Sequence, residues 1–168
     1  RSQIDDAQWR SAWDLKVFGF INLAREIYAG MKARGAGAIV NVIGIAAECN
    51  RAAYIVGSSG NAALVAFTRA LGAESVDHGV RVVGVSPGRI QTDRQLRSVR
   101  EAAERKFGDG ERWPEMLAEM SATFPFKRFG QPEEVADLVV YLASERASYI
   151  SSTIVNIDAG QSYRPGNY

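Results

Sequence analysis

The chain has 168 residues, of which 46% are apolar and 23% are charged, and its formal net charge at pH 7 is +1. A chain of this length can bury a hydrophobic core without disulfides, and its single cysteine, Cys49, can form none internally. The sequence has no apolar run long enough to span a bilayer and no basic stripe of the kind that binds nucleic acid. We therefore expect one domain over residues 1–168, located in the cytoplasm, with neither nucleic acid nor a membrane as a partner.

Predicted helices alternate with short apolar strands along the chain. Apolar residues recur at helical spacing in the long helices, and Asp5 or Asp6 can cap the first of them. The predicted strands are short runs rich in β-branched residues, and Pro132 suits the first turn of the last helix. The predicted elements are helix 5–34, strand 38–43, a helix from 58 or 59 to 77, strand 80–85, helices 94–106 and 114–120, helix 132–142 and strand 153–157.

The order of these elements predicts the fold class. Strands that are separated by helices need crossover connections, which make the sheet parallel and place helices on both of its faces. The fold class is therefore α/β, a doubly wound parallel sheet of the Rossmann type. Ligands of such sheets bind beyond the carboxyl ends of the strands, so we expect a functional site where residues 44–56, 87–92 and 158–161 converge.

The polar stretch over residues 93–130 is long for a connection between regular elements and predicts a lid over a substrate site. Its apolar residues would either line a substrate pocket or anchor the lid to the body of the domain. These residues are Trp113, Met116, Met120 and Phe124.

Five segments of the sequence carry a resemblance to a known family. They are GAGAIVNVIGIAA, GNAALVAFTRALGAES, GVRVVGVSPGRIQTD, RFGQPEEVADLVVYLAS and TIVNIDAG. In order and spacing they resemble the second half of the short-chain dehydrogenase/reductase family, over about residues 13–160. The resemblance implies part of an NAD(P)-binding Rossmann-like domain, without its first four strands and the Gly-rich turn that holds the pyrophosphate. It also implies NAD or NADP as the cofactor and a small carbonyl or alcohol as the substrate.

The four positions that carry catalysis in the family are substituted here. By the resemblance, the family's Asn falls on Lys16, its Ser on Gly44, its Tyr on Gly57 and its Lys on Asn61. In the family the Tyr exchanges a proton with the substrate, the Lys lowers the pKa of that Tyr, and the Ser positions the carbonyl. A glycine can do none of this, so the chain resembles an atypical member of the family.

Polar residues close to these positions are candidates for a replacement site. Tyr54 lies three residues before Gly57, and Ser58 follows Gly57 directly. Partial burial would lower the pKa of Lys16, whose ammonium could then support the Tyr54 phenol as an acid. The alternative is that Tyr54 is a loop aromatic and Lys16 a solvated helix residue. The predicted catalytic residues are Lys16, Tyr54, Ser58 and Asn61.

The turn after the second strand is the candidate nicotinamide site, formed by Pro87, Gly88, Ile90 and Thr92. The resemblance implies that backbone groups near Ile90 and the Thr92 hydroxyl bond the nicotinamide carboxamide, which needs a paired donor and acceptor. Taken alone, the Pro-Gly pair would indicate only a turn. We expect no metal site, because no metal-ligand spacing occurs in the sequence.

Three functions remain open. The leading prediction is an atypical oxidoreductase that transfers a hydride between NAD(P) and a carbonyl or alcohol, provided that the N-terminal half exists. The alternative is a catalytically silent relative that serves as an interaction or regulatory subunit, since several catalytic groups are lost together. A repurposed non-redox enzyme, acting through Lys16, Tyr54 and Ser58, has the least support.

Strand 38–43 would have an unpaired apolar edge, and such edges drive association. The resemblance implies that the long helices form a dimer interface and that the last strand supports tetramers. We therefore expect a homodimer or homotetramer, or a sheet that an upstream segment completes.

Overall fold

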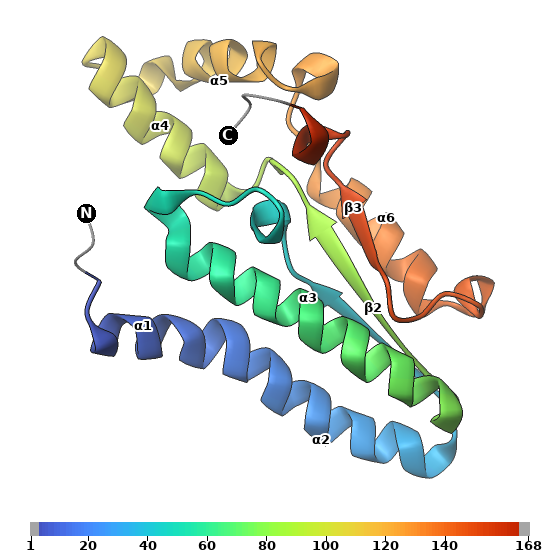
Figure 1. Cartoon of the computed structure of the whole chain (residues 1–168). Coiled ribbons are helices and arrows are strands. Elements are labelled where there is room, and N and C mark those ends of the chain that lie inside the picture. The colour runs from blue at the N-terminus through green and yellow to red at the C-terminus, as the bar shows by residue number, and fades with distance from the viewer. Residues whose placement is uncertain (1–3, 165–168) are drawn as a thin grey trace.

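A parallel sheet of three strands forms the centre of the structure, a computed structural model that describes residues 4–164 (Figure 1). The strands are β1 (Gly37–Val42), β2 (Val80–Pro87) and β3 (Ile154–Ile157), in the order β1-β2-β3. Both pairs are parallel, with Gly37 opposite Val80 and Gly84 opposite Ile154. The predicted α/β class and the three predicted strands are confirmed.

Helices cover both faces of this sheet. In Figure 1, α2 (Gly19–Arg34) and α3 (Ile55–Ser75) lie on one face and α6 (Pro132–Ala143) on the other. The central strand β2 is therefore shielded from both sides, which suits its nearly continuous run of valines. Its most deeply buried apolar side chains, all at most 1% exposed, are Val80, Val82, Val83 and Val85.

The first helix is continuous from α1 (Asp6–Trp13) to α2 but contains a π-helical turn at Asp14–Phe18. Asp5 caps it, because its side chain accepts a hydrogen bond from the Gln8 backbone N–H at 2.8 Å. A π-helical turn shifts the side chains that follow it around the helix axis, and such turns are frequent at functional sites. This turn contains Lys16, one of the predicted catalytic residues.

Helix α3 begins at Ile55, three or four residues before its predicted start at 58 or 59. The prediction was wrong because a 3₁₀ turn at Ala52–Tyr54 leads directly into the helix, which has no side-chain cap to mark its beginning. The small residues of α3 bring it close to the sheet: a Cβ on Gly72 would lie 2.7 Å from the backbone oxygen of Val82. A buried hydrogen bond of 2.9 Å from Asn41 Nδ2 to Thr68 Oγ1 joins β1 to α3.

Residues 93–130 form a helical hairpin at the carboxyl ends of the strands (Figure 1). Helices α4 (Asp93–Phe107) and α5 (Trp113–Ala122) pack against each other, and an ion pair between Lys106 and Glu119 joins them. The guanidinium of Arg112 also stacks on Phe107, with its Cζ 4.3 Å from the ring centroid. The hairpin therefore lies where the predicted lid would be, and its role as a lid stays a prediction.

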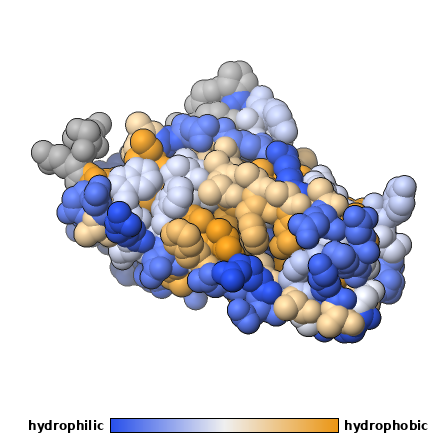
Figure 2. Space-filling view, turned by 60° about the horizontal axis from the view of Figure 1, so that its bottom comes forward, coloured by the Kyte–Doolittle hydropathy of each residue, from blue (hydrophilic) through white to orange (hydrophobic). Residues whose placement is uncertain are grey.

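Several large apolar side chains of the first helix are exposed. Figure 2 views the molecule from the side on which α1 and α2 lie in Figure 1, and apolar atoms gather in the middle of that face. The exposed large apolar residues of the π-helical turn and α2 are Leu15, Phe18, Leu23 and Ile27. Among residues 4–164, no helix combines the length and the apolar composition that crossing a membrane requires.

Candidate active site

The three loops that follow the strands meet at one end of the sheet, as the sequence predicts. The backbone N–H of Gly88 donates to the Ile157 carbonyl at 3.0 Å, which ties the β2 loop to the end of β3. A Cβ on Gly88 would lie only 2.8 Å from the Cβ of Asp158, so the approach of these two loops requires glycine. Pro87 is the last residue of β2 and directs the chain into this turn.

Tyr54 lies against the first turn of α3. A Cβ added to Gly57 would lie 2.1 Å from Tyr54 Cζ and 2.6 Å from its hydroxyl oxygen, distances that real side chains do not adopt. The phenol therefore fills the space in which a side chain at position 57 would begin. Tyr54 is 47% exposed, so its hydroxyl is accessible to a bound molecule.

Lys16 points from the π-helical turn to the end of β1. Its ammonium donates a hydrogen bond of 3.1 Å to the Ile43 carbonyl and lies 5.4 Å from the centroid of the Phe20 ring. Burial lowers the pKa of Lys16, and the nearby charge of Arg94 lowers it further. This partial burial agrees with the predicted direction of the shift, and the role of Lys16 in catalysis stays a prediction.

Asn61 and Ser58 are buried on the face of α3 that meets the sheet, and each is 4% exposed. Within the described residues, Asn61 Oδ1 and Ser58 Oγ have no hydrogen-bond partner. The Asn61 amide nitrogen lies 3.5 Å from where a Cβ on Gly44 would be. Buried polar atoms are rarely left unpaired, so these two are unusual features of this end of α3.

The structure brings some of the predicted catalytic residues together and leaves others apart. Lys16 and Asn61 both lie close to the peptide that joins Ile43 to Gly44, whereas Tyr54, the N-cap of α3, lies about two helical turns before Asn61. No hydrogen bond joins Lys16 to Tyr54 in the described part of the chain, and the one bond of the Lys16 ammonium goes to the Ile43 carbonyl.

The turn after β2 offers groups that suit an amide. Thr92 caps α4, since its hydroxyl oxygen accepts a hydrogen bond from Gln95 N at 3.3 Å, and the hydroxyl proton stays free to donate. The Ile90 carbonyl accepts from Thr92 N at 2.9 Å, whereas the Ile90 N–H has no acceptor among residues 4–164. A nicotinamide carboxamide needs such a donor beside a hydroxyl, so these residues fit it.

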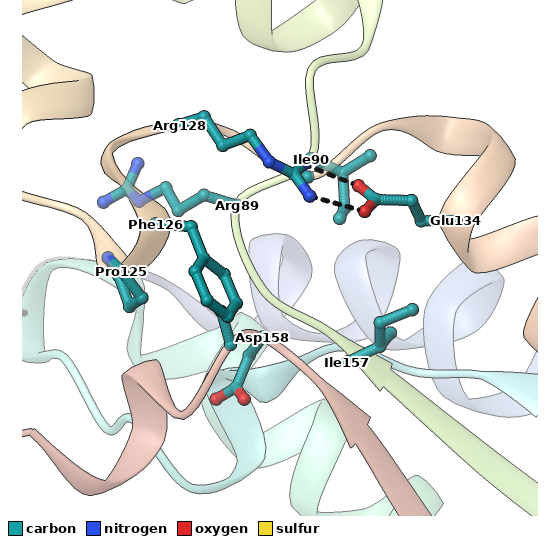
Figure 3. A pocket seen from close by; sticks show the side chains of 10 residues that line it. Arg89, Ile90, Pro125, Phe126, Arg128, Glu134, Ile157 and Asp158 are labelled. Carbon is teal, nitrogen blue, oxygen red and sulfur yellow. Dashed lines mark hydrogen bonds and ion pairs between the residues drawn. The ribbon is translucent and has the colours of Figure 1, made fainter.

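Two cavities flank this turn, and Arg89 borders both. The smaller, of about 90 Å³, lies between the β2 loop, the start of α6 and the end of β3 (Figure 3). Arg128 and Glu134 form an ion pair of 2.6 Å at its wall, and Phe126 extends across it towards Asp158. Phe126 has a left-handed backbone with φ of 52° and is 78% exposed.

The larger cavity, of about 300 Å³, lies between the β2 loop and α5. Three of the four apolar lid residues predicted to line a pocket do so here, namely Met116, Met120 and Phe124. Trp113 does not border either of these two cavities: the Arg100 guanidinium lies over its ring, with Cζ 5.5 Å from the centroid. Trp113 therefore joins α4 to α5.

Sequence reasoning missed Arg89 as a site residue. The signal was present, because an arginine inside the short turn SPGRIQT is the one charged residue of that turn. Within the part of the chain that the structure describes, no group of three His, Cys, Asp or Glu side chains could hold a metal ion. Cys49 is a buried free thiol.

Comparison with known proteins identifies the family. The family model described as Enoyl-(Acyl carrier protein) reductase matches residues 2–162. Galactitol 2-dehydrogenase (L-tagatose-forming) of Cereibacter sphaeroides is 35% identical over 162 residues, which are 94% of this chain and 58% of that protein. Nodulation protein G of Azospirillum brasilense is 30% identical over 163 residues, 97% of this chain and 61% of that protein.

A solved structure agrees with these matches. L-sorbose reductase from Gluconobacter frateurii, complexed with NADPH and L-sorbose, superposes with a TM-score of 0.88 at 32% identity. The match covers 96% of this chain and 61% of that protein. The chain therefore belongs to the short-chain dehydrogenase/reductase family, and it spans 58% to 61% of the length of these three relatives.

Proposed function

We propose that the protein is an NAD(P)-dependent oxidoreductase that transfers a hydride between the nicotinamide and the carbonyl or secondary alcohol of a small molecule. Family membership supports this reaction, as does the likeness to a reductase solved with NADPH and L-sorbose. The cofactor, when bound, supplies or accepts the hydride. The residues of this chain would bind the nicotinamide, orient the substrate and move the proton that accompanies the hydride.

The β2 turn is the proposed nicotinamide site. The Ile90 N–H would donate to the carboxamide oxygen, and the Thr92 hydroxyl would bond the carboxamide nitrogen or oxygen. Pro87 and Gly88 would hold the turn in place against β3, since Gly88 bonds Ile157 and permits the close approach to Asp158.

Tyr54 is the proposed proton donor and acceptor, and its position against Gly57 is the observation that carries this assignment. The phenol lies at the first turn of α3, beside the position that the family resemblance assigns to a tyrosine. In the reductive direction, the carbonyl carbon gains the hydride, the carbonyl oxygen gains the phenolic proton, and the phenolate is left behind. In the oxidative direction, the phenolate accepts the proton of the alcohol.

Lys16 is the proposed cation of the site, and Asn61 its amide. By the resemblance the family has Asn at the first position and Lys at the second, so this chain exchanges the two residue types between the π-helical turn and α3. One ammonium and one amide are thereby kept at the end of β1. An ammonium in a partly buried site would stabilise a phenolate that forms nearby. Asn61 Oδ1 and Ser58 Oγ would orient the bound molecule.

A catalytically silent subunit is the second candidate. Two observations favour it: Gly44 offers no hydroxyl at the end of β1, and the Lys16 ammonium donates to the Ile43 carbonyl. Such a subunit would keep the fold and its contact surfaces without turnover.

Oxidation of NADH and NADPH by the purified protein, with a panel of aldehydes, ketones and ketoacids, distinguishes the two candidates. The proposed enzyme consumes the reduced cofactor with at least one carbonyl. Replacement of Tyr54 by Phe lowers the rate about 100-fold or more, the range typical of losing a general acid. Binding of NADPH without oxidation by any member of the panel would favour the silent subunit instead.

A homodimer or homotetramer is also proposed. The apolar face of the first helix supports association, since Leu15 is 83% exposed and Leu23 is 62% exposed. One edge of β1 has no neighbouring strand among residues 4–164, and an upstream segment could cover it instead of a second copy. Light scattering of the purified protein measures the number of copies.

A further inference from the structure

The larger cavity contains a guanidinium that no carboxylate neutralises. Arg89 lies on its wall with Met116, Met120 and Phe124. Among the described residues, the Arg89 guanidinium forms no ion pair and instead lies over the Phe124 ring, with its Cζ 5.6 Å from the centroid. The one acid on the wall, Glu119, already pairs with Lys106.

The acids on the other side of Arg89 are also engaged elsewhere. In the smaller cavity, Glu134 accepts two hydrogen bonds from Arg128, at 2.6 and 2.8 Å. The carboxylate of Asp158 is held by its own loop, because it accepts from Gly160 N at 2.9 Å and Ser162 N at 2.8 Å. Neither carboxylate is therefore available to Arg89.

The surroundings of Arg89 are positive and partly desolvated. Burial lowers the pKa of its guanidinium, and the charge of Arg51, in the loop after β1, lowers it further. A half-buried guanidinium beside a second cation is costly unless an anion joins it. Arg51 lies in the loop that leads to Tyr54, so this positive region adjoins the proposed proton donor.

We infer that the substrate of the proposed reaction carries a carboxylate, which Arg89 binds while an apolar body packs between Met116, Met120 and Phe124. The planar guanidinium matches a carboxylate with two parallel hydrogen bonds. A cavity of about 300 Å³ accommodates a small molecule of this kind. A neutral polyol would leave Arg89 unpaired and place its hydroxyls against two methionines. The role of this carboxylate as a substrate rests on the proposed function, whereas its binding to Arg89 does not.

Calorimetric titration with octanoate and with octanamide tests the inference without any turnover. The two probes share the apolar chain and differ in charge. The wild-type protein should bind octanoate about 10-fold or more tightly than octanamide, the gain expected from hydrogen bonds to a charged group. Replacement of Arg89 by Met should abolish this preference, and replacement by Lys should keep part of it.

Arg146→Met is the matched control, because Arg146 also lies over an aromatic ring. Its Cζ is 5.7 Å from the Tyr141 ring centroid, and the Cζ of Arg89 is 5.6 Å from the Phe124 ring centroid. This variant should keep the full preference for octanoate. A second variant, Met116→Glu, adds a carboxylate to the cavity wall. It should weaken the binding of octanoate far more than the binding of octanamide. It gives an independent answer if Arg89→Met does not fold.

Three results would overturn the inference: octanamide binding as tightly as octanoate, a preference that survives Arg89→Met, or no binding of either probe. The proposed function can fail separately. A preference that depends on Arg89, together with no oxidation of NADPH by any carbonyl, would keep the carboxylate site and refute the reaction. Oxidation of NADPH by neutral ketones alone, with no Arg89-dependent preference for octanoate over octanamide, would support the proposed reaction and refute the carboxylate site.

Discussion

The phenol ring of Tyr54 occupies the space in which the side chain of residue 57 would begin, with Cζ 2.1 Å from the point where a Cβ of Gly57 would be. Tyr54 in this position and a larger residue at 57 therefore exclude each other. Only glycine at position 57 leaves room for the Tyr54 ring, so Gly57 allows Tyr54 to lie against α3.

This exclusion predicts that the effect of Gly57→Ala changes sign with the residue at 54. In the wild-type background the new Cβ displaces the ring, so the free energy of unfolding decreases. In a Tyr54→Ala background the space is open, and alanine should stabilise the helix by up to about 1 kcal/mol relative to glycine. Urea unfolding of the four proteins measures both effects. Additive effects would mean that ring and Cβ do not compete.

The lowered pKa of Lys16 predicts that the free energy of unfolding rises with pH in the alkaline range. Its pKa in the folded protein is lowered from the ordinary value of 10.5, so between these two values the unfolded chain binds more protons. The free energy of unfolding therefore increases as the pH rises through this window, and below it the group contributes no slope. Lys16→Met should lack this increase, whereas Lys32→Met, on the exposed side of α2, should retain it. Identical pH profiles for the wild type and Lys16→Met would contradict the partial burial of the ammonium.

The ion pair of Glu134 predicts that stability also rises with pH in the acid range. Its ion pair with Arg128, helped by a hydrogen bond from Gln131 N, lowers its pKa from 4.5 to about 2. The stabilisation is fully present above pH 4.5 and is lost as the pH falls towards 2. Glu134→Gln should flatten the stability profile in this window, and thermal unfolding measures it. Glu133→Gln removes one charge from the same helical turn and should leave the slope intact; an equal effect of both variants would exclude a specific ion pair.

The hydrogen bond between Asn41 and Thr68 predicts a non-additive effect on stability. Thr68→Val keeps the shape of the side chain but leaves the buried Asn41 amide without its acceptor, which should cost about 1–3 kcal/mol. In an Asn41→Leu background the same substitution should cost much less, because no polar group is left unpaired. Chemical unfolding of the single and double variants checks this, and equal costs in both backgrounds would contradict it.

The sequence predicted most of the fold because its signals are local. Valine-rich runs mark β1 and β2, and Pro132 marks the start of α6. The start of α3 was missed, since the 3₁₀ turn before Ile55 carries no capping residue. The π-helical turn around Lys16 was also missed, because no residue pattern distinguishes it from an α-helix.

The site was less predictable because it depends on contacts between distant segments. The partial burial of Lys16 was predicted from its position, but its bond to Ile43 spans 27 residues of sequence. The setting of Arg89 depends on the bridge between Ile90 and Gly130, which no local pattern encodes. Such pairings become visible only when the β2 loop and the segment before α6 are placed side by side.

Transfer of deuterium from nicotinamide-deuterated NADH or NADPH to a carbonyl would show directly whether the protein catalyses hydride transfer. Mass spectrometry of the product should show one deuterium on the carbinol carbon for the wild-type protein and for Tyr163→Phe, a matched change at an exposed tyrosine. The Tyr54→Phe variant should form the same product about 100-fold more slowly or worse. Absence of deuterated product with every carbonyl tested, or an equal rate with Tyr54→Phe, would contradict the account.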